Sequence, residues 1–196
     1  YVGTDGKLYW LMPRILRLGH AYLESARLPR LVQPFLQRIG DGTGEVAYLG
    51  VLDGATTVFV GRSGSARQPT HGYVMGTRLP AQVTAVGMAI LASMDEADAD
   101  AWVEGCELRS FTSHTFATKA QLRAALARFR HSGYSLSEQQ LELNYRGIAV
   151  PLLDRQNQVH GAISITMPIN HEETDHALQR VLSVMQEAAK SLRPLL

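Results

Sequence analysis

The sequence of 196 residues has little cysteine, little net charge and no long apolar run, and each shortage excludes a class of protein. A single cysteine, Cys106, excludes a disulfide framework and a multi-cysteine zinc site. The 19 Lys and Arg residues balance 18 Asp and Glu residues, so the chain has no basic field that would draw nucleic acid to it. No run approaches the roughly 18 apolar residues that cross a bilayer, and the first residues show no signal-peptide pattern. We therefore expect a cytoplasmic protein with no membrane partner.

What the chain does have is a hydrophobic fraction of 45%, which excludes disorder and supports one domain, or one domain with a short appendage. The appendage is at the start. Residues 1–11 read as two short β segments around the turn at Asp5 and Gly6. A hairpin of this size is not stable by itself, so we interpret it as the last piece of a preceding domain. After Pro13, apolar residues recur at helical spacing and predict a helix that ends near Arg27.

The rest of the chain alternates between strand and helix patterns. Strands are predicted over residues 45–52, 55–62, 145–153 and 159–167, with a further strand near residues 73–75. Helices are predicted over residues 29–40, 81–93, 95–104, 118–133 and 173–192. Hairpins join the strands, which predicts an α+β fold: an antiparallel sheet with helices packed on it.

The strands at 145–153 and 159–167 each have one bulky apolar face and one face of small or hydroxyl residues, because side chains alternate along a strand. The small residues are Gly147, Ala149 and Pro151 on the first strand and Ala162, Ser164 and Thr166 on the second. If the two small faces coincide, they leave a concavity rimmed by hydroxyl groups. Protein interiors contain few voids, so either the alanine-rich helix at 81–93 fills this space or a small molecule does.

Patterns for catalysis or metal binding are incomplete. His171 and His176 lie five residues apart, whereas a zinc-binding HExxH motif requires a spacing of four. Cys106 has no base at a recognisable spacing, and Ser63 and Ser65 match neither a nucleophile elbow nor a P-loop. We expect no metal, no cofactor and no catalytic residues. An enzyme that acts on a small organic acid in the same cleft, or a purely structural dimerisation module with a filled pocket, are the alternatives.

Two arginines are candidates for binding an anion. Arg62 closes a predicted strand, and Arg78 lies just before Pro80 and the buried helix. A guanidinium there could bind a carboxylate through two parallel hydrogen bonds, and the helix N-terminus offers backbone N–H groups for the same purpose. Each arginine could equally be a surface charge.

Several motifs resemble those of a known family. Residues 76–87, with the sequence GTRLPAQVTAVG, resemble the signature that opens the central helix of IclR-type transcriptional regulators. A second signature of that family is matched by residues 133–134, 142, 148–151 and 161–165. The segments 1–3, 7–11 and 17–19 look like its junction between winged helix and linker helix. The resemblance covers nearly the whole chain, and it points to the branch that controls aromatic-acid catabolism in the β-ketoadipate pathway.

The resemblance implies a domain organisation and a site. Residues 1–11 would be the C-terminal remnant of a winged-helix DNA-binding domain, residues 12–27 a linker helix and residues 28–196 a GAF-like effector-binding domain. The effector would lie between the sheet and the helix that follows Pro80. The site residues that the resemblance implies are Leu79, Thr84, Ala85, Val86, Ser137, Gly147, Ala149, Ser164 and Thr166, and Arg62 and Arg78 are the candidates noted above.

The function that follows is that of a non-catalytic sensor. Its effector would be a small organic or aromatic carboxylate, either a protocatechuate-like aromatic acid or a β-ketoadipate-like dicarboxylate. Binding would change the geometry of a homodimer or homotetramer, and hence binding to operator DNA through an N-terminal domain that precedes Tyr1. Many family members have an acidic residue where Ser137 stands here, and its loss fits an anionic effector because it lowers repulsion against a carboxylate.

Overall fold

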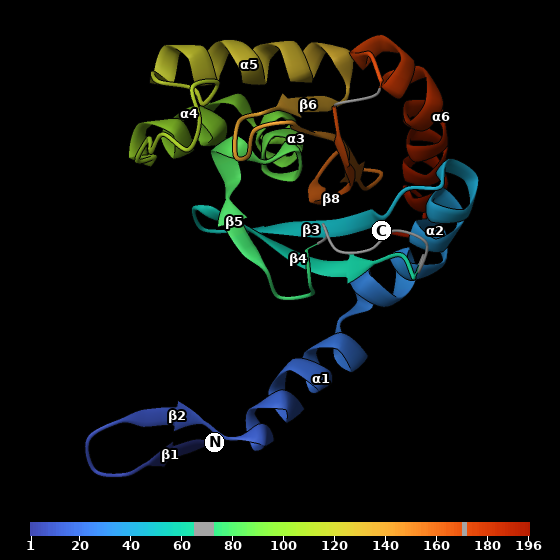
Figure 1. Cartoon of the computed structure of the whole chain (residues 1–196). Helices are drawn as coiled ribbons and strands as arrows, with labels where there is room; N and C mark the ends of the chain where they lie inside the picture. The colour runs from blue at the N-terminus through green and yellow to red at the C-terminus, as the bar shows by residue number, and fades with distance from the viewer. Residues whose placement is uncertain (65–72, 170–171) are drawn as a thin grey trace.

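The computed structural model describes residues 1–64, 73–169 and 172–196, and its centre is a six-stranded sheet whose neighbouring strands are all antiparallel (Figure 1). The order across the sheet is β5-β4-β3-β8-β7-β6. The strands are β3 (Ala47–Asp53), β4 (Thr56–Arg62), β5 (Arg78–Pro80), β6 (Ser135–Glu138), β7 (Tyr145–Leu153) and β8 (Val159–Pro168). The predicted α+β fold with an antiparallel sheet is confirmed.

Helices cover both faces of this sheet. They are α2 (Arg27–Thr43), α3 (Ala85–Ser93), α4 (Glu96–Gly105), α5 (Lys119–Ser132) and α6 (Thr174–Leu192). The helices α2 and α6 pack on one face over the bulky residues of β7 and β8, such as Ile148 and Ile163. The helix α3 packs on the other face, and α4 and α5 cover its outer side (Figure 1). All but the last residue of α3 are buried, as its lack of a polar face predicts.

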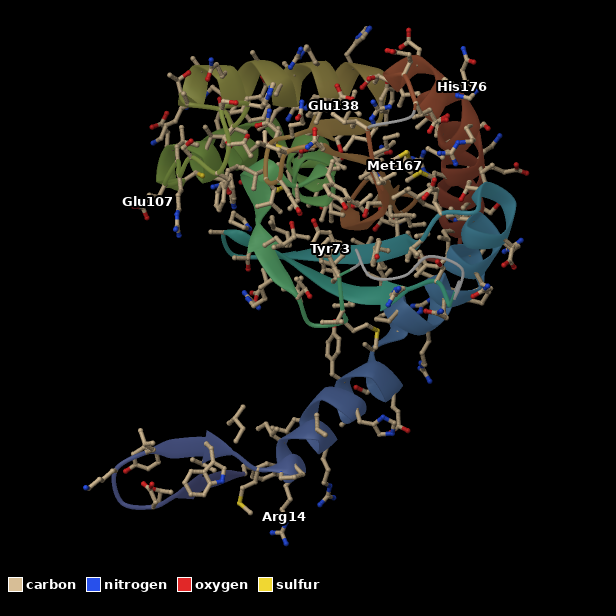
Figure 2. The ribbon with its side chains drawn as sticks, viewed as in Figure 1. Arg14, Tyr73, Glu107, Glu138, Met167 and His176 are labelled. Atoms are coloured by element: carbon tan, nitrogen blue, oxygen red, sulfur yellow. The ribbon has the colours of Figure 1, made fainter. Side chains whose placement is uncertain are left out.

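The N-terminal segment lies apart from this body. A hairpin of β1 (Val2–Thr4) and β2 (Tyr9–Leu11) is followed by a 3-10 turn (Pro13–Ile15) and α1 (Leu16–Ser25), and the whole segment extends away from the sheet (Figure 1). Figure 2 shows Arg14 on this extension, far from the labelled residues of the body. The hairpin predicted around Asp5 and Gly6 is confirmed, and large apolar side chains such as Tyr9 are exposed on it.

Two predictions near the buried helix are wrong in their boundaries. The strand expected near residues 73–75 instead forms at Arg78–Pro80, because a turn ending at Gly76, with φ of +87°, precedes the pairing with β4. The helix expected over 81–93 is interrupted. A 3-10 turn (Ala81–Val83) leads into Thr84, which is extended and caps α3 by accepting a hydrogen bond from the amide of Gly87 at 3.1 Å.

Other boundaries shift less. The helix expected over 29–40 begins at Arg27 and continues to Thr43, where Gly44 ends it in the left-handed conformation. The capping box at Thr118 and the helix end at Gly133 are confirmed. The positions of Ser65 and His171 lie outside the described residues, so their predictions stay untested. Within the described part of the chain, none of the helices is long and apolar enough to cross a membrane.

Candidate functional site

The small faces of β7 and β8 do coincide. In the antiparallel register Gly147 lies opposite Thr166, and Ala149 lies opposite Ser164. The bulky residues of the two strands are likewise paired with each other, as with Ile148 and Ile165. Because cross-strand partners point to the same face of a sheet, the two strands together form a flat, shallow surface on one side and a thick apolar layer on the other.

The helix α3 fills one part of this shallow surface. Ala85 and Val86 pack with Ala149 and Ala162 in one apolar cluster. The approach is close: a Cβ atom at Gly147 would lie 3.0 Å from the Cβ of Ala85. The alanine-rich helix therefore packs against the small residues Ala149 and Ala162, and its first residue also approaches Gly147.

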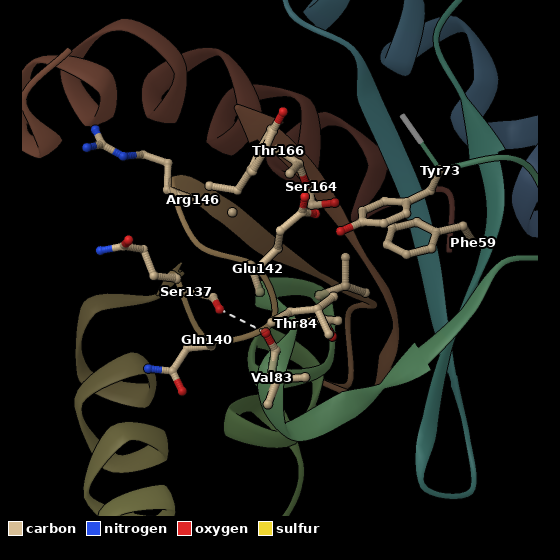
Figure 3. Close-up of a pocket in the computed structure, with 16 residues that line it drawn as sticks. Phe59, Tyr73, Val83, Thr84, Ser137, Gln140, Glu142, Arg146, Ser164 and Thr166 are labelled. Atoms are coloured by element: carbon tan, nitrogen blue, oxygen red, sulfur yellow. Dashed lines mark hydrogen bonds between the residues drawn. The ribbon is translucent and has the colours of Figure 1, made fainter. Parts of the chain in front are cut away.

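The other end of the shallow surface is a cavity beside the N-terminus of α3 (Figure 3). Its volume is about 40 Å³, and the space not occupied by atoms is about 430 Å³ when the open solvent at its mouth is counted. The lining residues are Phe59, Tyr73, Val83, Thr84, Ala85, Val86, Ser137, Gln139, Gln140, Leu141, Glu142, Tyr145, Arg146, Gly147, Ser164 and Thr166.

Three hydroxyl groups of this lining differ in their partners. The Ser137 hydroxyl donates to the carbonyl oxygen of Val83 at 2.9 Å, which Figure 3 marks with a dashed line. The Thr84 hydroxyl lies 3.1 Å from that of Thr57 and accepts from the Gly87 amide. Ser164 is 2% exposed, and its Oγ has no hydrogen-bond partner among the residues that the structure describes. A buried hydroxyl without a partner is costly, so a ligand that supplied one would gain free energy from it.

The first turn of α3 offers further donors. The first four amides of a helix have no acceptor within the helix itself. At α3 the Thr84 side chain accepts from Gly87, and the next amide, that of Met88, is satisfied by the carbonyl of Thr84 at 3.0 Å. The amides of Ala85 and Val86 have no such partner within the helix, and both residues line the cavity. The helix dipole makes this end favourable for a negative charge.

Aromatic rings form the opposite wall. The rings of Phe59 and Tyr73 are stacked, with centroids 4.7 Å apart and an angle of 17° between planes. Tyr48 meets the Phe59 ring edge-on at 5.5 Å. Burial, and to a smaller extent the negative charge of Glu142, raise the pKa of Tyr73 to about 12. This wall provides a flat apolar surface with one hydroxyl at its edge (Figure 3).

The predicted site residues divide into two groups. Those that line the cavity are Thr84, Ala85, Val86, Ser137, Gly147, Ser164 and Thr166. Leu79 and Ala149 lie outside the lining, in the apolar packing around α3. Arg78 is an exposed residue of β5 that forms an ion pair with Asp53 at 2.7 Å. Arg62 lies opposite Tyr48 in the antiparallel register of β3 and β4, and it is not among the described lining residues. Contact between either arginine and an effector stays a prediction.

The loop between β6 and β7 contributes lining residues that strand alternation could not find. Gln139, Gln140 and Glu142 belong to this loop, where side chains follow no regular period. A neighbouring segment holds it in place: the Thr115 hydroxyl donates to the carbonyl of Gln140 at 2.6 Å, and the amide of Phe116 donates to the Gln140 side chain at 3.0 Å. Glu142 is part of the second signature noted in the sequence, but no site role was predicted for it.

Arg146 is the one basic lining residue in the described part of the chain. Its guanidinium points away from the cavity (Figure 3), is 4% exposed and lies 3.1 Å from the carboxylate of Glu138. No group of three or more potential metal ligands occurs among the described residues. The cavity can therefore hold a small molecule through hydroxyl groups, helix amides and stacked rings, with Glu142 as its single described acid.

Comparison with known proteins identifies the family. The family model described as "Bacterial transcriptional regulator IclR C-terminal" matches residues 20–193. The Pca regulon regulatory protein of Pseudomonas putida is 33% identical over 193 residues, which cover 98% of this chain and 66% of that protein. The p-hydroxybenzoate hydroxylase transcriptional activator of Acinetobacter baylyi is 32% identical over 200 residues, which cover 100% of this chain and 74% of that protein. The chain thus spans about two thirds to three quarters of the length of these relatives.

Solved structures agree. The inducer-binding domain of a double mutant of the PobR transcription factor from Acinetobacter, in complex with 3-hydroxybenzoic acid, has a TM-score of 0.81 and 29% identity, covering 87% of this chain and 100% of that one. The IclR structure from Thermotoga maritima has a TM-score of 0.85 over 98% of this chain and 78% of that one, and at 21% identity it shows the shared fold. The chain therefore belongs to the IclR family of bacterial transcriptional regulators, which are not enzymes, and its sheet and helices form the C-terminal effector-binding domain of that family.

Proposed function

We propose that this domain is the sensor of a transcriptional regulator of aromatic-acid catabolism, and that a small aromatic carboxylate binds in the cavity between α3 and the sheet. The observation that carries the proposal is the buried Ser164 hydroxyl without a partner, which faces a cavity beside a helix N-terminus. The named relatives support the choice of effector class, because they regulate Pca genes and p-hydroxybenzoate hydroxylase, and the PobR domain binds 3-hydroxybenzoic acid.

The cavity suggests how such a ligand is held. The carboxylate faces the first turn of α3, where the amides of Ala85 and Val86 donate and the helix dipole favours the charge. The ring lies against the stacked wall of Phe59 and Tyr73. The Ser164 hydroxyl donates to a polar atom of the ligand. This mode of binding does not use Arg78, whose guanidinium is bound to Asp53.

The link to DNA is part of the proposal. In this account residues 1–11 are the end of a winged-helix domain, residues 12–27 a linker helix and residues 28–196 the sensor. The exposed apolar side chains of the N-terminal segment, such as Tyr9 and Leu16, would be covered in a cytoplasmic homodimer or homotetramer. The effector acts by binding one arrangement of the subunits more tightly than another, which changes the spacing of the DNA-binding domains.

Isothermal titration calorimetry with 3- and 4-hydroxybenzoate tests the proposal. We expect Ser164→Ala to weaken binding by about five- to tenfold, because one buried hydrogen bond is lost. Thr166→Phe, at a half-buried lining position, should abolish binding because the new ring fills the cavity. Ser183→Ala makes the same chemical change on the exposed side of α6 and should leave binding unaltered. Equal affinity in the wild type and in Thr166→Phe would disprove the placement of the site.

The remaining alternative is a structural dimerisation module with a filled pocket. The buried Ser164 hydroxyl argues against it, because among the described residues a filled pocket supplies that group with no hydrogen-bond partner. A thermal-shift screen of small organic acids decides between the two: a sensor is stabilised by at least one of them, and a structural module by none.

A further inference from the structure

Glu142 places a negative charge at the cavity, and the proposed function does not require this charge. It is the single acidic residue of the described lining, and its carboxylate points into the cavity toward Ser164 and the hydroxyl of Tyr73 (Figure 3). The charge of Glu142 contributes to the raised pKa of Tyr73, which places the two groups in electrostatic reach of each other. The one basic lining residue of the described part, Arg146, has its guanidinium turned away from the cavity and 3.1 Å from the carboxylate of Glu138.

The position of Glu142 is fixed by its loop. Gln139 and Asn144, which flank the loop, both have positive φ values, of 55° and 65°. The amide of Asn144 donates to the side chain of Gln139 at 3.1 Å, and the Gln140 side chain donates to the carbonyl of His114 at 2.6 Å. These hydrogen bonds hold the loop beside the cavity, and Glu142 is an exposed residue of the cavity lining.

An acid at this place accepts hydrogen bonds and repels anions. A second carboxylate on the effector would meet the negative charge of Glu142 at the exposed side of the cavity, and like charges repel. A hydroxyl group on the effector would instead donate to Glu142, and a hydrogen bond to a charged acceptor is stronger than a neutral one. The same hydroxyl oxygen can accept from Ser164, whose buried Oγ has no partner in the described part of the chain. Glu142 and Ser164 together therefore fit one hydroxyl group, which donates a hydrogen bond to the first and accepts one from the second.

We propose that Glu142 and Ser164 together recognise a ring hydroxyl of the effector, so that the cavity selects hydroxylated aromatic monocarboxylates over unsubstituted aromatic acids and over dicarboxylates. This inference rests on the proposed function, because it assumes that an aromatic acid binds with its carboxylate at the N-terminus of α3. It assigns Glu142 as a specificity-determining residue. Of the two effector classes that the sequence left open, it selects the hydroxybenzoate type over the dicarboxylate type.

The test compares ligands and variants by calorimetry on the whole chain. The ligands are 3- and 4-hydroxybenzoate, benzoate as the analogue without a hydroxyl, and isophthalate as an aromatic dicarboxylate. In the wild type we expect the better hydroxybenzoate to bind about tenfold or more tightly than benzoate, the value of one charge-assisted hydrogen bond. Isophthalate should bind more weakly than benzoate, because its second carboxylate faces Glu142.

Two variants and one control separate the roles. Glu142→Ala should reduce the ratio between hydroxybenzoate and benzoate affinities to near one. Glu142→Gln keeps an acceptor but removes the charge, so the ratio should fall by several-fold while isophthalate binding improves. Glu187→Gln removes the same charge from an exposed position on α6 and should change neither ratio.

The outcomes distinguish this inference from the proposed function. If benzoate and the hydroxybenzoates bind equally well to the wild type, or if the ratio survives in Glu142→Ala, then the recognition of a hydroxyl by Glu142 is wrong although the cavity is still an aromatic-acid site. If none of the four acids binds the wild type, both proposals fail together. A circular dichroism melt of each variant excludes loss of folding as the cause of lost binding.

Discussion

The two faces of the strands β7 and β8 differ although they share one backbone. On the face toward α2 and α6, residues such as Ile163 and Ile165 are fully buried in the larger apolar cluster. On the face toward α3, small residues leave space that the helix fills at one end and a cavity occupies at the other. One side of the sheet therefore stabilises the fold, and the other combines packing with a site. Substitutions on the two faces should separate stability from ligand binding.

The largest expected effect is on the bulky face. Ile163→Ala should lower the free energy of unfolding by about 3 to 4 kcal/mol, because it removes a fully buried side chain and leaves a void that the sheet cannot close. Ser164→Ala, one residue further along on the opposite face, should change it by less than about 0.5 kcal/mol, because it removes a buried hydroxyl without a partner. Urea denaturation of both variants measures the difference. Equal losses would mean that the two faces do not differ in this way.

A second effect concerns the contact between α3 and the sheet. A Cβ atom at Gly50 would lie 2.6 Å from Cγ1 of Val86, closer than real contacts allow. Gly50→Ala should therefore cost about 1 to 3 kcal/mol and displace α3, with weaker effector binding as a second result. The matched control is Gly105→Ala at the exposed end of α4, where nothing lies within 4 Å of the new atom and no loss is expected. Thermal denaturation together with calorimetry checks both results.

We expect a smaller effect of pH on stability, and this pH dependence differs between the two faces of the sheet. On the α6 side, hydrogen bonds from Arg180 hold the pKa of Glu172 below its ordinary value of 4.5. The stability that this provides is complete above pH 4.5 and is lost as the pH falls through the lowered pKa. Glu172→Gln should be less stable at neutral pH and should lose less stability on acidification. Denaturation between pH 3 and 7 tests this, since a parallel pH dependence in both proteins would contradict it.

On the face of the sheet that carries the cavity, we expect stability to fall at alkaline pH. Burial raises the pKa of Tyr73 from 10.0 to about 12. Because the pKa of Tyr73 is higher in the folded state, its contribution to the free energy of unfolding is complete below pH 10. That contribution is lost as the pH rises through 12. Tyr73→Phe should reduce the loss of stability between pH 10 and 12 and leave the pH dependence at acidic pH unchanged. Unfolding curves at pH 9, 10 and 11 measure it.

Much of the site was predictable because alternation along a strand is a local property. The small faces of β7 and β8, and hence Gly147, Ser164 and Thr166, follow directly from the order of residues. The antiparallel register then brings these residues together, since a shift by one residue would have exposed the bulky face. The position of Thr84 and Ala85 at the cavity came from the family resemblance, and the break that makes Thr84 a helix cap was not predicted.

The residues that were missed depend on contacts between distant segments. Glu142 lies on a loop without periodicity, and hydrogen bonds between Gln140 and residues 114–116 hold that loop in place. Arg78 was a reasonable candidate for binding an anion, but Asp53 at the end of β3 forms an ion pair with its guanidinium. Tyr73 was expected in a strand, whereas the turn before β5 frees its ring to stack on Phe59.

The order of residues by itself determined the fold class, the two unlike faces of the sheet and the buried character of α3, because each depends on the spacing of side chains along one element. The tertiary structure decided how far α3 extends over the small face, where the cavity remains, and which charged group enters it. Those outcomes depend on volumes and charges contributed by segments far apart in the chain. No local pattern records how such segments meet, since packing brings them together only in the folded molecule.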